Sequence, residues 1–225
     1  MHVPTIYNTD IDESYDELVL NDDKLHHLFN VLRVRNNSPI KISNGKGILF
    51  FGKLNDNNIQ ISSKKEYKRD KNINIFVPPI QDKTRFRFMI EKLGELNVNS
   101  ITIGSTDYSQ KANVNTDKVI SWLVSSVEQS GTPFIPKFEI CEEIDFNTFN
   151  HGLDICGKNI NDNLSFQNIA IGPEGGWSQD ELNKFSYTSS INEFTFRTET
   201  AAIESANKSV TDKLQNSSNI EKGLE

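Results

Sequence analysis

A glycine-rich segment that follows an apolar stretch is the part of the chain best suited to bind a ligand. Ile169–Ile171 is apolar, Gly172–Gly176 reads Gly-Pro-Glu-Gly-Gly, and Ser178 begins a capping-box pattern that ends at Glu181. In α/β sheets, ligands bind beyond the carboxyl ends of strands, where backbone amides and helix N-termini are accessible. The alternative is an ordinary tight turn between a strand and a helix. The spacing matches neither a GxGxxG fingerprint nor a P-loop.

A second polar cluster, Arg197-Thr198-Glu199-Thr200, precedes an alanine-rich helix pattern. We interpret it as a second ligand loop that presents charged side chains. Its structural alternative makes Thr198 an N-cap and Glu199 a first-turn acid that interacts with the helix dipole, and both interpretations can hold. The alanines at 201, 202 and 206 would let another helix approach closely, in a dimer or in a knotted packing.

The elements that must position these loops alternate between strand and helix from Ile73 onward. Strands are expected at 73–77, 100–103, 138–141, 168–171 and 193–196, and helices over 86–96 and 119–127, after Ser178 and from 201. The second of these helices is expected to end near Gly131, after Glu128-Gln129-Ser130, with the glycine in the left-handed conformation. Such alternation predicts an α/β fold with a mainly parallel sheet covered by helices over residues 72–225.

Residues 1–71 have a different pattern, which predicts a small β-rich barrel with one helix. The expected helix spans 24–32, with Leu25, Leu28, Phe29 and Leu32 on one face and Asn21–Asp23 as caps. Strands are expected near 40–42, 48–51 and 59–61, joined by turns at Asn44-Gly45 and at 55–58. The basic segment 62–74 is predicted to be the linker between the two domains.

The composition narrows the class of partner. The chain has 225 residues and a net charge of −7, with 24 basic and 31 acidic side chains, which argues against a protein that coats nucleic acid without specificity. Residues 1–72 carry 11 basic and 10 acidic side chains, whereas residues 73–225 carry 13 and 21. A polyanion is therefore expected to meet the N-terminal part first.

Several other classes are excluded by what the sequence lacks. It has no run of 18 apolar residues, so no membrane span is expected, and its start lacks the pattern of a signal peptide. Cys141 and Cys156 cannot form a disulfide framework, and no Cys or His spacing indicates a metal site. We expect a cytoplasmic globular protein without a metal.

Six segments, taken together and in this order, resemble the RsmE family of ribosomal RNA small-subunit methyltransferases, which belongs to the SPOUT superfamily. They lie at 26–34, 44–47, 91–96, 128–131, 171–176 and 197–201, and the resemblance covers nearly the whole chain. Each segment alone is weak evidence, but six in register are highly specific.

The resemblance implies an S-adenosylmethionine-dependent enzyme that methylates N3 of one uridine near the 3′ end of 16S ribosomal RNA. It implies a PUA-like barrel over 1–71, a SPOUT domain over 72–225 whose trefoil knot forms the cofactor pocket, and a homodimer. The residues expected to bind the cofactor are Ile171, Gly172, Pro173, Glu174, Gly175, Gly176, Ile191, Phe196, Arg197, Thr198, Thr200 and Ala201.

Methylation of a weakly acidic imide nitrogen needs positioning and the removal of one proton. The candidate bases are Glu174 and Glu199, and Arg197 could stabilise negative charge that develops on the uracil oxygens. The residues expected to face RNA are Arg33, Arg35, Lys64, Lys65, Lys68 and Arg69, and the alternative for them is a solvated basic surface.

The chain departs from the family pattern at a few positions. Asn97 and Asn192 stand where glycine is usual, and asparagine tolerates a positive φ better than other residues with a side chain. Tyr108, Thr132 and Phe194 stand where basic residues are usual. Two rival hypotheses follow: an RNA-binding or ribosome-assembly factor that has lost its catalytic activity, and a SPOUT methyltransferase that modifies another RNA.

Overall fold

The computed structural model describes residues 3–69, 72–111, 113–159 and 167–220, with the backbone alone at 159 and 210–220. The chain divides into two compact units, the first made of Met1–Asp70 and Leu123–Ile135 and the second of Lys71–Trp122 and Pro136–Glu225. The division predicted between residues 71 and 72 stays a prediction, because Lys71 lies outside the described residues.

The first unit is built on a mixed five-stranded sheet. Its strands are β1 (Thr5–Tyr7), β2 (Glu17–Val19), β3 (Pro39–Ser43), β4 (Ile48–Asn55) and β5 (Asn58–Glu66), in the order β1-β3-β4-β5-β2. β1 and β3 are parallel, and the other pairs are antiparallel. The linker prediction is wrong for residues 62–66, because β5 continues there as the partner of Ile48–Phe51 in β4.

The helix of this unit is shorter and less regular than predicted. It consists of α1 (Asp22–His26), which the Asn21 side chain caps, followed by a π-helix, η1 (His27–Val31). Leu28 is fully buried in the core of the unit, with Leu25 and Phe29 packed beside it, but Leu32 is 39% exposed. The apolar face is therefore one turn shorter than the sequence pattern predicted.

Residues 123–135 include the end of α3 (Thr116–Ser130) and hydrogen-bond to the N-terminal sheet. The amide of Tyr7 donates to Glu128 Oε1 at 3.0 Å, and the Ser43 hydroxyl donates to the Thr132 carbonyl at 2.9 Å. Gly131 has φ +70°, so the left-handed stop predicted there is confirmed. The Glu128–Gly131 motif therefore supports the edge of the N-terminal sheet.

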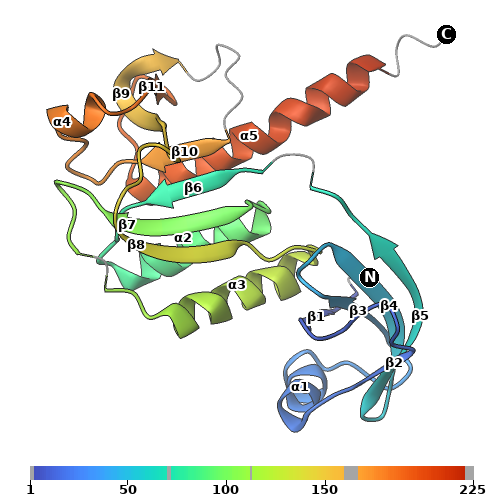
Figure 1. Cartoon of the computed structure of the whole chain (residues 1–225). Coiled ribbons are helices and arrows are strands. Elements are labelled where there is room, and N and C mark those ends of the chain that lie inside the picture. Colours follow the sequence, from blue (N-terminus) through green and yellow to red (C-terminus); the bar gives the residue numbers. More distant parts are fainter. Residues whose placement is uncertain (1–2, 70–71, 112, 160–166, 221–225) are drawn as a thin grey trace. The chain divides into compact units, whose positions relative to one another are not determined.

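The second unit is a six-stranded sheet in which every pair is parallel (Figure 1). Its strands are β6 (Asn74–Val77), β7 (Ser100–Ser105), β8 (Lys137–Glu143), β9 (His151–Asn159), β10 (Asn168–Ile171) and β11 (Tyr187–Ser190), in the order β11-β9-β10-β6-β7-β8. The remaining helices are α2 (Lys83–Glu95), α4 (Gln179–Leu182) and α5 (Thr198–Ile220).

The two faces of this sheet are packed differently because side chains alternate along each strand. Phe76 and Ala170 join a cluster that includes Trp177 and Phe185. α2 and α5 pack against each other, and Ala202 and Ala206 of α5 are fully buried. The close approach of another helix to these alanines, in a dimer or a knotted packing, stays a prediction.

Two sequence predictions fail at the edge formed by β9 and β11. β9 was missed, because His151–Asn159 contains two glycines and has no regular apolar alternation. The strand expected at 193–196 is a loop, and β11 lies at Tyr187–Ser190. Phe194 is 70% exposed, and its amide donates to the Asn192 side chain at 2.7 Å instead of to a neighbouring strand.

Asn97 has φ +60°, so the expectation that asparagine replaces a glycine in a left-handed conformation is confirmed there. Asn192 does not have a positive φ, and that expectation is wrong at this position.

We expect Asn97→Ala to lower the free energy of unfolding by about 1 kcal/mol, because alanine tolerates the left-handed region poorly. Asn97→Gly should be close to neutral. Urea denaturation checks both variants, with Asn113→Ala, an exposed loop position, as the control. Equal stability of the alanine and glycine variants would contradict this reasoning.

His151 begins β9 and is buried, with Nε2 2.8 Å from the hydroxyl of Ser189. Burial lowers the pKa of His151 to about 4, because it disfavours the charged ring. The folded protein therefore keeps this ring neutral at pH values where an unfolded chain would protonate it.

The stability contributed by neutral His151 should be present above pH ~6.5 and lost as the pH falls from there toward about 4. His151→Gln should flatten the dependence of unfolding free energy on pH in this window, and His27→Gln should not. Urea denaturation at half-unit pH steps measures this. Parallel profiles for wild type and His151→Gln would exclude the mechanism.

Candidate active site

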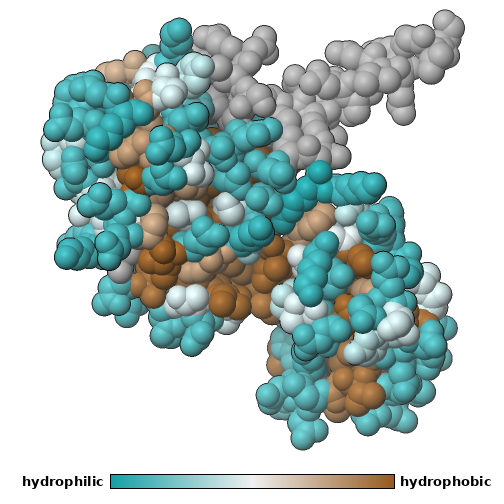
Figure 2. Space-filling model, viewed as in Figure 1, coloured by the Kyte–Doolittle hydropathy of each residue, from teal (hydrophilic) through white to brown (hydrophobic). Residues whose placement is uncertain are grey.

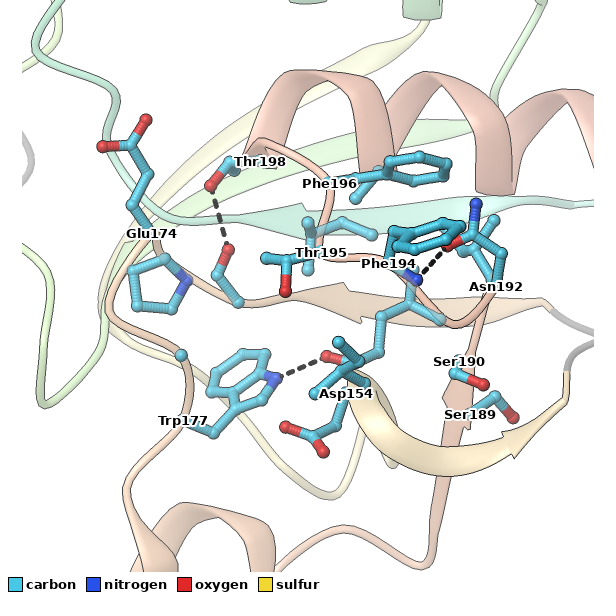
Figure 3. Close-up of a pocket in the computed structure, with 18 of the residues that line it drawn as sticks. Asp154, Glu174, Trp177, Ser189, Ser190, Asn192, Phe194, Thr195, Phe196 and Thr198 are labelled. Carbon is cyan, nitrogen blue, oxygen red and sulfur yellow. Dashed lines mark hydrogen bonds between the residues drawn. The ribbon is translucent and has the colours of Figure 1, made fainter.

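A cavity of about 300 Å³ lies at the carboxyl ends of β10 and β11, beside residues 153–155 of β9 (Figure 3). Because β9 is the parallel neighbour of both strands, these three residues lie near the loops that follow β10 and β11 at one edge of the sheet. The lining comes from residues 153–155, 171–177, 189–192 and 194–196, with Thr198 and Ala201 of α5. The volume is at the lower end of the range for small-molecule sites.

The glycine-rich loop needs its glycines for two different reasons. Gly176 has φ +75°, a conformation that side chains disfavour, although open space surrounds the position of its missing Cβ. A Cβ on Gly172 would lie 3.0 Å from Nε1 of Trp177. That indole nitrogen donates to the carbonyl of Leu153 at 2.9 Å, so Trp177 ties the loop to β9.

β9 contributes to the cavity through an irregularity in its pairing. Gly152 pairs with Thr188, but the next residue of β11, Ser189, pairs with Lys158. Residues 153–157 therefore bulge relative to β11, and Leu153, Asp154 and Ile155 line the cavity.

The start of α5 closes the cavity on another side. Thr198 is the first residue of the helix, and its hydroxyl donates to the Gly172 carbonyl at 3.0 Å. The prediction that Thr198 is the N-cap is therefore wrong, because its side chain joins the helix to the glycine-rich loop.

A second cavity, of about 600 Å³, borders the first. The two share Pro173, Glu174, Gly175 and Thr198 as lining. The rest of the second cavity comes from residues 78–82, Arg85 and residues 108–110. The loop Pro173–Gly175 thus separates two cavities, each of which is large enough to hold a small chemical group.

Arg85 of α2 connects the two acidic residues of this region. Its Nε and Nη2 donate to the two carboxylate oxygens of Glu199 at 2.8 and 2.7 Å, and Nη2 also donates to Glu174 at 2.6 Å. The hydrogen bonds from Arg85 lower the pKa of Glu199 and raise the pKa of Arg85 itself. Glu199 is 8% exposed, and both of its carboxylate oxygens accept from Arg85. Its lowered pKa makes it a weak base, so it is a poor candidate for proton removal.

Most of the residues predicted to bind the cofactor line the first cavity. The ten that do are Ile171, Gly172, Pro173, Glu174, Gly175, Gly176, Ile191, Phe196, Thr198 and Ala201. Arg197 and Thr200 line neither cavity and are exposed, although Arg197 lies next to Thr198 in the wall of both.

Sequence reasoning missed Arg85, the β9 residues Leu153–Ile155, and Ser189 and Ser190. Arg85 lies one residue before the helix predicted over 86–96, and its partners are 89 and 114 residues away. The one available signal was the tendency of ligands to bind at the carboxyl ends of parallel strands. It could not be applied to β9, because β9 itself was missed.

Family models match both parts of the chain. An RNA methyltransferase domain matches residues 68–208, and an RNA methyltransferase PUA domain matches residues 20–64. The chain belongs to this RNA methyltransferase family. The RsmE family expected from the six segments is thereby confirmed.

Named relatives agree with this membership. The chain is 25% identical over 205 residues to ribosomal RNA small subunit methyltransferase E of Buchnera aphidicola, covering 81% of each chain. It is 26% identical to the protein of the same name from Rickettsia conorii, covering 81% of this chain and 84% of that one.

The fold is also that of a solved member of the family. The crystal structure of ribosomal RNA small subunit methyltransferase E from Neisseria gonorrhoeae, bound to S-adenosyl methionine, aligns with a TM-score of 0.78 at 22% identity. The alignment covers 95% of this chain and 98% of that one. The predicted fold class, a SPOUT-type α/β domain preceded by a PUA-like domain, is confirmed, and the trefoil knot stays a prediction.

The residues predicted to face RNA in this methyltransferase divide into two groups. Arg33, Arg35 and Lys68 are exposed and have no side-chain interaction that the described residues show. Lys64 and Lys65 are exposed too, but Lys64 pairs with Glu13 and Lys65 lies over the ring of Tyr67. Arg69 is partly buried and lies over the ring of Phe134. Burial lowers the pKa of Arg69 to about 10, and we interpret its packing as structural.

The described residues of the methyltransferase contain no group of three or more His, Cys, Asp or Glu side chains able to hold a metal ion. No helix among them is both long enough and apolar enough to cross a membrane.

We expect Arg85→Ala to lower the melting temperature, because it leaves the Glu199 carboxylate buried without its partner. Glu199→Gln added to Arg85→Ala should recover part of this loss, since the uncompensated charge is then gone. Melting temperatures of wild type, both single variants and the double variant measure the coupling between Arg85 and Glu199. Strictly additive shifts would contradict the ion pair.

Proposed function

We propose that this protein transfers a methyl group from S-adenosylmethionine to N3 of a uridine in the 16S ribosomal RNA of the small subunit. The observation that carries the proposal is the pair of adjoining cavities at the strand ends. One has the lining of a small-molecule site, and the other lies across the Pro173–Gly175 loop from it. Family membership and the names of the relatives support the choice of RNA as substrate.

The first cavity suits the chemistry of the cofactor. Leu153, Ile171 and Phe196 offer apolar surface to an adenine ring, and the glycine-rich loop brings backbone groups close to it. Asp154 supplies a carboxylate that can attract the positively charged part of the molecule. When bound, the cofactor supplies an activated methyl group, so the protein has to contribute position and proton removal.

Glu174 is the proposed general base. It lines both cavities, and its side chain is 64% exposed. As the bond between N3 and the methyl group forms and the bond between sulfur and that methyl group breaks, the N3 proton would pass to the Glu174 carboxylate. Glu199, whose pKa is lowered, is proposed to hold Arg85 in place. The exposed Arg197 is proposed to meet the RNA from outside the cavities.

The proposed setting is the cytoplasm, and the proposed form is a homodimer, as the resemblance implies. An exposed apolar surface supports self-association. Figure 2 shows apolar side chains gathered over α3 and β8, where Ile120 and Ile140 are 46% and 43% exposed. Such a surface is typical of a protein–protein interface.

Wild type should transfer labelled methyl groups to small ribosomal subunits that lack the modification, and the product nucleoside should be 3-methyluridine. Glu174→Gln should lower kcat by roughly 10²–10⁴-fold at neutral pH, because the base is lost. The deficit should shrink as the pH rises and N3 ionises without help. Because Glu174 also lines the cofactor cavity, affinity for S-adenosylmethionine is measured separately from kcat. Glu142→Gln, an exposed acid on β8, is the control.

Three outcomes would count against the proposal. An unchanged kcat in Glu174→Gln would remove Glu174 as the base. Methylation of a different nucleotide or RNA would support the rival SPOUT methyltransferase. Folded wild-type protein that binds the subunit without transferring label would support the rival assembly factor.

A further inference from the structure

The charged side chains around the second cavity favour an uncharged ligand. Its lining carries the carboxylates of Asp82 and Glu174 and one guanidinium, that of Arg85, which is paired with Glu174 and with Glu199 behind it. Arg197 also attracts Asp82 and Glu199, but it does not line the cavity. A phosphate group would be repelled there, whereas an uncharged nucleobase would not. The ligand that enters this cavity should therefore be the base of a nucleotide and not its phosphate.

The cavity also contains an aromatic surface without a partner. Tyr108 lines it and is 60% exposed, and within the described parts of the chain its ring has no aromatic or cationic neighbour. Its Cβ lies 3.3 Å from the position that a Cβ on Gly175 would occupy, so the ring stands against the glycine-rich loop. An exposed ring of this kind is typical of proteins that stack an unpaired base.

The turn that carries Tyr108 is held rigidly. The amide of Asp107 donates to Glu181 Oε1 at 3.0 Å, and the Asp107 carboxylate accepts a hydrogen bond from Ser178. Glu181 is 3% exposed and completes the capping box of α4 with Ser178. The amide of Thr106 donates to Ser109 Oγ at 2.7 Å. The backbone that carries the ring is therefore held in place, which lowers the entropic cost of stacking.

Hydrogen-bonding groups for the edge of a base surround the ring. Gln81 and Gln110 line the cavity and carry amides that both donate and accept. Arg85 uses Nε and Nη2 for its two glutamates, which leaves Nη1 able to donate to a carbonyl oxygen. A pyrimidine such as uracil carries carbonyl oxygens and an imide N–H on that edge.

We propose that this second cavity binds an unstacked pyrimidine base of single-stranded RNA, and that Tyr108 is the residue on which the base stacks. The proposal rests on the proposed function, in which RNA is the substrate. It adds the place where the base lies and the side chain that selects an unpaired nucleotide.

The test is the affinity of a fluorescein-labelled uridine hexamer, measured by anisotropy with S-adenosylhomocysteine present. Removing one base–aromatic stack in Tyr108→Ala should weaken binding by between about 5-fold and about 150-fold. Tyr108→Phe keeps the ring and should bind like wild type. The matched control is Tyr187→Ala, which removes a tyrosine that is 58% exposed and lines neither cavity.

The same variants should bind S-adenosylmethionine with wild-type affinity in calorimetry. Hexamer binding by Tyr108→Ala that matches wild type would overturn the inference, as would no hexamer binding by wild type. A loss of affinity for S-adenosylmethionine, in place of the hexamer, would show that the cavity serves the cofactor and would also overturn it. If wild type binds the hexamer but transfers no methyl group to the subunit, the proposed function fails, while the hexamer affinities still decide the role of Tyr108.

Discussion

The ion pairs of Arg85 with Glu199 and Glu174 are the interaction on which the candidate active site depends. They join α2, the loop after β10 and the first turn of α5, three segments that come from distant parts of the chain. Without the guanidinium, two carboxylates would lie near each other at the edge of the sheet and repel. Asp82 fixes the start of α2 by accepting from the amides of Thr84 and Arg85, so the position of the arginine follows from a helix cap.

The remaining constraint is geometric. Parallel strands bring their carboxyl ends to one edge, and each of the three segments that line the cavity departs from regular structure in its own way. The loop after β10 uses glycines, β9 bulges against β11, and the segment after β11 is turned by the Asn192 side chain. Trp177 and Thr198 then connect these loops through hydrogen bonds to carbonyl oxygens. The cavity is thus formed by local irregularities at the edge of an otherwise regular sheet.

The sequence predicts those parts of the site whose signals are local. The glycine-rich loop, the capping box at Ser178 and the left-handed Asn97 each depend on a few neighbouring residues, and each was found. β9 was not found, because a bulged strand with two glycines loses the alternation that identifies strands. Phe194 and Phe196 have the same alternation, although they lie in a loop, where both line the cavity. Arg85 could not be assigned, since its partners come from distant parts of the chain.

The central claim is that residues 153–155 of β9 and the loops after β10 and β11 form one cofactor site. Hydrogen–deuterium exchange with and without S-adenosylhomocysteine tests it most directly. The account predicts slower exchange at residues 153–155, 171–177 and 189–196, and unchanged exchange in the N-terminal sheet. Protection confined to any other segment, or no protection at saturating ligand, would contradict it.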